Sequence, residues 1–336
     1  MFCAFFVILR SEKKLLIDPM DRIFKIAKLF VLLSVAMVYV CDATAQNPNS
    51  IKKYGNLFSV KSFLYNNELS FKNHSSGLSY VPGMHSGIGV GFWVKYFPFD
   101  VCYRQEVAPI GDSKYKHRKS TDMQLRGYNR FFAGDIYIQK YSGFYETIAN
   151  RFRLKYREID NLTYNPDIKV SQVDLVGKYI FNNEDFSYKA GFTAGERQLV
   201  SCGSATAGLA LYYLRIRSDS LLLKEQSCDL RSCNIGVNGG YAYNYVFGKH
   251  STLFASGMIG LNASTSIFSG WISDKINISP VFHFKGAYWL NYDKWSFGIT
   301  ATYNIIHHTL GDEMTVYVHT RRTEVVVMRR IWVKKN

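Results

Sequence analysis

The stretch Trp295-Ser296-Phe297-Gly298-Ile299-Thr300-Ala301-Thr302-Tyr303-Asn304-Ile305 decides the fold of this chain. Its odd-numbered positions carry Trp, Phe, Ile, Ala, Tyr and Ile, whereas its even-numbered positions carry Ser, Gly, Thr, Thr and Asn. Successive side chains of a β-strand point to opposite faces. This strict alternation therefore predicts a strand with one apolar face and one face of small polar residues.

The same alternation recurs along the chain downstream of residue 45. It predicts clear strands over 86–96, 186–197 and 235–247, and noisier strands over 173–181 and 282–290. The segment 314–333 is β-rich without a clean phase, and 59–71 is a further strand candidate. The composition agrees, because 16% of the residues are aromatic and the chain has 25 Gly but only 7 Pro. We expect about twelve strands, within a range of about ten to fourteen.

The polar faces of these strands distinguish two kinds of β protein. They consist mainly of Gly, Ser, Asn, Thr and Ala, whereas the solvent face of a soluble sheet usually carries more charge. No stretch after residue 45 reaches the roughly 18 apolar residues of a membrane-spanning helix. The prediction is therefore an all-β fold, a transmembrane antiparallel up-and-down β-barrel. The alternative is a soluble secreted β-sandwich whose apolar faces cover a packed core.

Turn signals between the predicted strands alternate in length. Short periplasmic turns and long extracellular loops produce this alternation in outer-membrane barrels. The alternation breaks between 198 and 231, where the connection near Val200 is short although a long one is expected. Tight connections are expected at 97–98, 131–132, 182–185, 248–249 and 292–293, and long ones at 107–118, 143–168, 217–231 and 264–279.

The N-terminal segment is interpreted as an export signal. Residues 20–45 combine basic residues, an apolar run over 29–40 and the sequence Ala43-Thr44-Ala45, which together are typical of a signal peptide cleaved between Ala45 and Gln46. Residues 1–19 are interpreted as an upstream mis-start and 46–336 as one barrel domain. Residues 1–45 hold six basic and four acidic residues, so their removal lowers the net charge from +15 to +13. Export of this kind predicts the outer membrane of a Gram-negative bacterium.

Charged residues on the predicted inner faces are the main functional candidates. Charges inside a barrel either pair across the lumen and fill it, or line a path for a counter-ion, here a small ligand or an anionic solute. The basic segments 114–119 and 151–157 could contact lipopolysaccharide phosphates. The candidate lumen charges are Lys95, Arg126, Asp135, Asp174, Lys178, Lys189 and Lys285.

Cysteine and histidine residues are the other candidates for specific chemistry. Cys228 and Cys233 are close enough in sequence for a disulfide, while Cys102 and Cys202 stand alone, which leaves no spacing typical of a metal site. His307 and His308 could lie at a rim near Asp312 and Glu313, the arrangement that a lipid-modifying enzyme would need. The glycines in 87–91 lie within a strand and open no helix, so they predict no nucleotide loop. We expect no enzyme activity, no cofactor and no nucleic-acid partner.

Three short phrases carry a family resemblance. They are Leu78-Ser79-Tyr80-Val81-Pro82, then Asp135-Ile136-Tyr137-Ile138-Gln139 followed by Gly143-Phe144-Tyr145, and Gly240-Tyr241-Ala242-Tyr243. With them, residues from about 52 to 333 resemble an uncharacterised family of outer-membrane barrels from Bacteroidetes, domain of unknown function 4421. The resemblance implies an outer-membrane location, contact with membrane lipid and with the barrel-assembly machinery, and no assigned catalytic residues. The chain ends Trp332-Val333-Lys334-Lys335-Asn336, so the aromatic assembly signal would lie at Trp332.

Together these observations predict a monomeric, non-enzymatic outer-membrane barrel. Envelope structure, ligand binding and passage of small solutes all fit this class. An outer-membrane lipid-modifying enzyme is the alternative of another class, and a rim histidine meeting a serine would be its structural sign.

Overall fold

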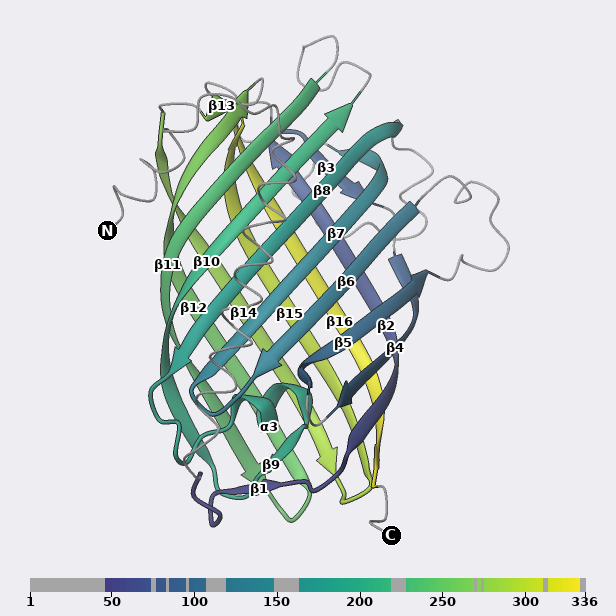
Figure 1. Ribbon diagram of the computed structural model, residues 1–336. Helices are drawn as coiled ribbons and strands as arrows, with labels where there is room; N and C mark the ends of the chain where they lie inside the picture. The colour runs from purple at the N-terminus through teal and green to yellow at the C-terminus, as the bar shows by residue number, and fades with distance from the viewer. Residues whose placement is uncertain are drawn as a thin grey trace.

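The computed structural model shows a closed barrel of antiparallel strands (Figure 1). It describes residues 46–73, 77–82, 85–94, 97–106, 119–147, 163–218, 228–268, 271–272, 275–310 and 314–332. The predicted signal peptide and its cleavage after Ala45 lie outside these residues, so both stay predictions. No helix in the described ranges is long and apolar enough to cross a membrane.

Twelve strands form the ring. Each pairs antiparallel with its neighbours. Because β16 also pairs with β2, and β11 with β12, the ring is closed and every strand has a partner on both sides. The predicted all-β barrel of about twelve strands is confirmed. The ring strands are β2 (Phe58–Asn73), β4 (His85–Val94), β5 (Phe97–Glu106), β6 (Lys119–Tyr128), β7 (Phe132–Thr147), β8 (Thr163–Ile180), β10 (Cys202–Ser218), β11 (Cys228–Phe247), β12 (Ser251–Phe268), β14 (Asn277–Asn291), β15 (Trp295–Leu310) and β16 (Met314–Ile331).

Shorter elements lie at the two ends of the ring. At one end, β1 (Ile51–Lys53) pairs with β9 (Glu196–Gln198), next to the helix α3 (Tyr188–Thr193). At the other end lie β3 (Ser79–Pro82), which pairs with both β2 and β7, and β13 (Trp271–Ile272), which pairs antiparallel with the end of β12. We call the end with α3 and the short turns the turn end, and the opposite end the loop end.

The alternation predicted from the sequence sets the two faces of the wall. On β15, Phe297 and Ile299 are exposed on the outer face, while Ser296 and Thr300 are buried in the lumen. On β4, Ile88 and Phe92 are likewise exposed outward. The phase predicted for β11 also holds, with its tyrosines outward and Asn238, Ala242 and Asn244 inward. The further candidate at 59–71 is the strand β2.

The segment 186–197 is not a strand of the wall, contrary to the prediction. Its residues form the six-residue helix α3 and the short strand β9 inside the turn end of the barrel. Phe186, Tyr188 and Phe192 are fully buried there. Apolar residues at every second position gave the pattern of a strand. The pattern arose because wall residues surround this short helix, so that its side chains are buried on all sides. The connection from β8 to β10 is therefore long at the turn end, which explains the break in turn alternation.

The last strand has a clear phase that the sequence obscured. On β16, Val318, Arg322, Glu324 and Val326 point into the lumen and are almost fully buried, while Val325 and its odd-numbered neighbours face outward. Both faces of this strand carry charged as well as apolar residues, so hydropathy alone could not assign them.

Candidate functional site: the closed lumen

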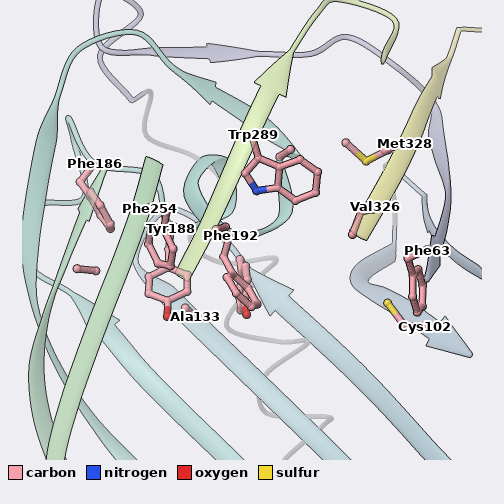
Figure 2. Packing of buried hydrophobic residues seen from close by; sticks show 14 of the residues in the cluster. Phe63, Cys102, Ala133, Phe186, Tyr188, Phe192, Phe254, Trp289, Val326 and Met328 are labelled. Carbon is pink, nitrogen blue, oxygen red and sulfur yellow. The ribbon is translucent and has the colours of Figure 1, made fainter. Parts of the chain in front are cut away.

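An apolar plug fills the lumen at the turn end. We define the plug as Phe186 together with α3, and Figure 2 shows its rings packed between residues of several wall strands. The Tyr188 ring lies 5.0 Å from that of Phe254 on β12 and 5.1 Å from that of Tyr128 on β6, both edge-on. The Trp289 side chain is 2% exposed. The plug thus brings opposite sides of the wall into one apolar cluster.

Local sequence explains why α3 forms here. Ser187 caps its first turn, because the Ser187 Oγ accepts a hydrogen bond from the Ala190 backbone N–H at 3.0 Å. The helix ends where Ala194 takes a left-handed conformation, with φ of 52°. Gly191 lies so close to the wall that an added Cβ would be 2.2 Å from the Asn244 Oδ1. Only glycine lets the helix approach this closely.

The segment 46–53, which we call the strap, contacts the plug at the turn end of the barrel. Its strand β1 pairs with β9 from Ile51 opposite Gln198 to Lys53 opposite Glu196. The buried Gln198 amide donates to the Ser50 carbonyl at 3.2 Å, and its Oε1 accepts from the Ser187 backbone N–H at 3.0 Å. Gln198 therefore joins the strap to the start of α3.

Asp185 is the second anchor of the strap. Its Oδ1 accepts hydrogen bonds from the Ser50 Oγ at 2.7 Å and the Asn47 Nδ2 at 2.8 Å. These two donors lower the pKa of the Asp185 carboxyl below its ordinary value of 3.8, because they stabilise the ionised form. The anchor is therefore intact at neutral pH.

An ionic layer crosses the middle of the lumen. The Arg322 guanidinium on β16 contacts both carboxylate oxygens of Asp122 on β6, at 2.6 and 2.7 Å. Arg104 on β5 contacts Asp122 at 3.3 Å and also pairs with Glu324. Arg126 lies 3.3 Å from the other Glu324 oxygen. Three guanidinium groups thus share two carboxylates, and the amides of Asn67, Gln124 and Gln139 add hydrogen bonds to these charged groups.

Between the ionic layer and the plug lie two further buried ion pairs. The Lys285 Nζ on β14 is 2.5 Å from Asp135 on β7, and Tyr128 donates to the same carboxylate at 2.6 Å. Lys61 pairs with Asp100 across β2 and β5. Charges in a low-dielectric interior are tolerated only when paired and hydrogen-bonded. These pairs therefore fill much of the lumen with charges that neutralise one another.

The loop end is closed by a second apolar cluster. It draws buried residues from six of the twelve wall strands and from β3. The Phe71 ring stacks on Tyr80 of β3 at 4.8 Å and meets Phe144 of β7 edge-on at 5.4 Å. The cluster comprises Leu69, Phe71, Tyr80, Tyr141, Phe144, Ile168, Val170, Leu214, Ile216, Leu310, Val316 and Val318.

The structure places five of the seven candidate lumen charges on the inner wall. Arg126, Asp135 and Lys285 take part in the ion pairs above. Lys178 donates to the Tyr188 hydroxyl at 3.0 Å. Asp174 accepts from the Gln172 amide at 2.6 Å, and its Oδ1 has no hydrogen-bond partner among the described residues.

The other two candidates differ. Lys189 belongs to α3 and not to a wall strand, and its Nζ lies 4.5 Å from the centroid of the Trp93 ring and 3.9 Å from Glu196. Lys95 lies outside the described residues.

Sequence reasoning missed most of the ionic layer. Asp122, Arg322 and Glu324 were not identified, because their strands had no readable phase. The Arg322–Asp122 contact joins residues 200 positions apart. On β6, Asp122 and Arg126 lie at even-numbered positions, as do Arg322 and Glu324 on β16, and these positions face the lumen. This spacing is the signal that could have found them.

The predicted disulfide is not formed. Cys233 is a free cysteine, as are Cys102 and Cys202. Cys228 and Cys233 lie five residues apart on the single strand β11, about 16 Å along an extended chain. A disulfide needs Cα atoms within about 7 Å, so these two positions cannot bond within the strand.

The histidine pair cannot form one catalytic site. His307 and His308 are consecutive on β15, so they point to opposite faces of the wall. His308 is fully buried in the lumen, and neither of its ring nitrogens has a hydrogen-bond partner among the described residues. His307 packs on Tyr317 with ring centroids 4.1 Å apart. Asp312, Glu313 and the basic segments 114–118 and 151–157 lie outside the described residues, while Lys119 begins β6.

Within the described ranges, no group of three or more His, Cys, Asp or Glu side chains could hold a metal ion. The glycines of 87–91 lie in β4, where an added Cβ at Gly89 would meet the Phe63 ring at 2.1 Å. They give room for side chains in the lumen.

Comparison with known families identifies the chain at family level. Residues 49–327 match the family described as Domain of unknown function (DUF4421), and the chain belongs to that family. The family named from the sequence is therefore confirmed, while the Bacteroidetes origin stays a prediction. No curated protein sequence matches the chain.

Solved structures with similar folds are outer-membrane proteins. The translocator domain of the autotransporter NalP from Neisseria meningitidis shares 11% identity, with 93% of this chain and 98% of that chain covered and a TM-score of 0.42. The outer membrane protease OmpT from Escherichia coli shares 6%, with coverages of 86% and 99% and a TM-score of 0.34. The beta domain of the Bordetella autotransporter BrkA shares 10%, with coverages of 79% and 98% and a TM-score of 0.36. Likenesses at this level assign no activity.

The buried Lys285–Asp135 pair yields a stability prediction. Changing Lys285→Met leaves the Asp135 carboxylate buried without its cation, and the free energy of unfolding should fall by about 3–5 kcal/mol. The double change Lys285→Met with Asp135→Leu removes both charges and should recover most of that loss. Urea unfolding in detergent micelles measures both, with Lys249→Met in an exposed turn as the control. A double variant as unstable as the sum of its single variants would contradict this account of the pair.

The strap yields a prediction about pH and exchange. Changing Asp185→Ala removes both strap hydrogen bonds, so the backbone amides of β9 and Leu199 should exchange with solvent faster, while Glu184→Ala, beside it and exposed, should not change them. Because the folded pKa of Asp185 is lowered, its contribution is present above the ordinary value of 3.8 and is lost as the pH falls through the lowered pKa. Amide exchange, corrected for intrinsic rates, should therefore show intact protection at neutral pH and loss only in strong acid. Equal exchange in both variants would exclude the anchoring role.

Proposed function

We propose that this protein is an outer-membrane β-barrel with a permanently filled lumen, which serves envelope structure or ligand binding and does not pass solutes freely. The observation that carries the proposal is the filling of the lumen at three levels by the plug, the ionic layer and the loop-end cluster. An anion path would need cations that face water. In the described lumen, Lys61, Lys285 and the arginines of the ionic layer each pair with a carboxylate.

The outer face supports the membrane location. Large apolar side chains on neighbouring strands are between about 40% and 60% exposed there, including Leu64, Ile88, Leu209, Ile259 and Ile299. Soluble monomers rarely expose a contiguous apolar surface of more than a few hundred Å². A continuous belt of this kind around a closed ring fits the hydrocarbon layer of a membrane.

Charged residues mark the two edges of this belt. On β16, Arg329 lies near the turn end and stacks on Trp295 with its guanidinium carbon 5.2 Å from the ring centroid, while Arg321 pairs with Glu68 nearer the loop end. Eight residues separate the two arginines, which is about 26 Å along a strand and about 20 Å along the axis of a barrel with ordinary strand tilt. That height is close to the apolar band of outer-membrane barrels.

The lengths of the turns support an orientation of the barrel with its turn end in the periplasm. Three connections at the turn end span only 129–131, 248–250 and 292–294. Short turns lie on the periplasmic side of outer-membrane barrels, which would place α3, β1 and the C-terminal end of β16 in the periplasm. The proposal includes export through the signal peptide cleaved after Ala45, in a Gram-negative bacterium of the Bacteroidetes.

The proposal also covers the oligomeric state and the partners of the protein. The protein acts as a monomer without a cofactor, in contact with outer-membrane lipid and lipopolysaccharide, and the barrel-assembly machinery inserts it. Enzyme activity is not part of the proposal, because the rim histidines that suggested it point to opposite faces of β15. A small ligand stays part of the proposal.

Conductance in planar bilayers tests the closed lumen. Purified protein, first shown to co-fractionate with outer membranes, should give no stable ohmic current at low voltage, because each of the three levels blocks the path. A porin inserted under the same conditions serves as the positive control. Long-lived open channels in the wild-type protein would refute the proposal, and recovery of the protein in the soluble fraction would refute the membrane location.

A further inference from the structure

A patch of basic side chains lies on the outer face of the wall, toward the loop ends of four neighbouring strands (Figure 1). Each of its members is next to a residue that is buried in the lumen, so its own side chain points outward. The register pairs bring these members together in two adjacent rows across the strands. We call them the basic patch, which comprises Lys140 on β7, Lys169 on β8, Arg215 and Arg217 on β10, and Arg231 on β11.

Three arginines of the basic patch converge on one carboxylate. Arg215 donates to Asp229 of β11 through Nε at 2.7 Å and through Nη2 at 2.6 Å. The Arg231 Nη2 contacts the same carboxylate at 2.7 Å, and the Arg217 Nε lies 3.6 Å from it. Arg215 is directly opposite Arg231 in the register, an arrangement in which like charges destabilise a strand pair. The Asp229 carboxylate offsets only one of these three positive charges.

The basic patch keeps a positive charge beside its acidic neighbours. Among the described residues, Asp229 and Asp167 lie beside it, and Asp167 accepts a hydrogen bond at 2.7 Å from the last serine of β10. Five basic side chains against two carboxylates give a net charge of +3. The Arg217 side chain is 53% exposed, and Lys140 and Lys169 are also exposed. An anion on the outer face can therefore reach them.

The basic patch lies at the loop-end edge of the apolar belt. On β11, every outward position from Cys233 to Phe247 is uncharged, and Arg231 is the first charged residue beyond them. Twelve residues separate Arg231 from the outward Tyr243, which is about 40 Å along the strand and about 30 Å along the axis of a tilted barrel. The apolar band of outer-membrane barrels is about 25 Å tall. The arginines therefore lie at the height of the lipid headgroups, on the extracellular side in the proposed orientation.

Phosphate is the anion whose chemistry best matches the basic patch. A guanidinium group offers a planar fork of N–H donors that fits phosphate oxygens, and lysines add point charges. A phosphomonoester carries a charge of about −1.5 to −2 near neutral pH, so it would offset most of the excess. The position of the patch indicates that this phosphate belongs to a lipid. Leu209 and Val237, lower on the same strands, are about half exposed in the apolar belt, where they would contact the hydrocarbon chains of such a lipid.

We propose that the basic patch binds a phosphomonoester group of an outer-leaflet glycolipid such as lipopolysaccharide. The guanidinium groups of Arg215 and Arg217 hold the phosphate, Lys140 and Lys169 add positive charge around it, and the acyl chains of the same molecule lie along the apolar belt. The inference rests on the proposed membrane location and orientation. It deepens that proposal, because it gives the contact with lipopolysaccharide a site on the wall strands, made of residues that the sequence had not indicated.

Lipid binding measured by native mass spectrometry tests the basic patch. The purified barrel in detergent, titrated with lipid A that carries two phosphates, should bind it about tenfold more tightly than the double variant Arg215→Gln with Arg217→Gln does. The matched control, Lys249→Gln with Arg329→Gln, removes two exposed charges at the turn end and should keep the wild-type affinity. Lipid A stripped of its phosphates should bind the wild type as weakly as intact lipid A binds the double variant.

Free phosphate and a conservative variant complete the test. Inorganic phosphate at the concentration of the lipid should not displace lipid A, which separates a lipid site from a site for free phosphate. If the glutamine variant does not fold, Arg215→Lys with Arg217→Lys keeps the charge but loses the guanidinium forks, and it should bind lipid A several-fold more weakly than the wild type. Equal affinity of the wild type for intact and stripped lipid A, equal affinity of the wild type and the variant that folds, or displacement by phosphate would each overturn the site.

The location of the protein is measured separately from its lipid affinity. Heat modifiability in gels shows whether each variant is a closed barrel, and co-fractionation with outer membranes tests the membrane location. A protein that co-fractionates with outer membranes but binds intact and stripped lipid A equally would refute the basic patch alone. Recovery in the soluble fraction would refute the membrane location on which the inference rests.

Discussion

A closed ring of twelve strands encloses more space than its wall side chains alone fill, and the rest of this structure depends on how the chain fills that space. Barrels of about eight strands are filled by their own side chains, whereas larger ones hold ligands, channels or plugs. Here a helix, a layer of ion pairs and an apolar cluster occupy successive levels. The apolar levels require close packing, and the charged level requires that each ionised group has a partner.

Strand β16 links all the levels. Near the turn end, the Arg330 Nη2 donates to the Ala194 carbonyl at the end of α3, at 2.7 Å. In the middle it supplies Arg322 and Glu324, and near the loop end it supplies Val316 and Val318. It also closes the ring by pairing with β2. The charges on its inner face, which obscured the phase of this strand in the sequence, are therefore the groups that hold the interior together.

The sequence predicted the wall better than the contents. Stretches such as 295–305 have one apolar face and one small polar face, so alternation alone assigns both the strand and its orientation. Phe186, Tyr188 and Phe192 carry the same alternation but belong to the plug, since a period of two cannot exclude a six-residue helix buried on all sides. The ionic layer could not be predicted, because Asp122 meets Arg322 only after twelve strands have closed into a ring. The local sequence pattern thus determines which face of a strand a residue occupies, whereas closure of the ring determines which charged residues meet.

Chemical labelling of Cys102 tests the filled lumen most directly. This native thiol points inward from β5, is 0% exposed and contacts the apolar cluster around the plug. In a protein whose other mature cysteines are changed, Cys202→Ser, Cys228→Ser and Cys233→Ser, a charged water-soluble maleimide should not react with Cys102 in intact vesicles, yet should react fully after unfolding in urea. Rapid labelling of Cys102 in the folded, membrane-embedded protein would mean a water-filled lumen, and would contradict the account.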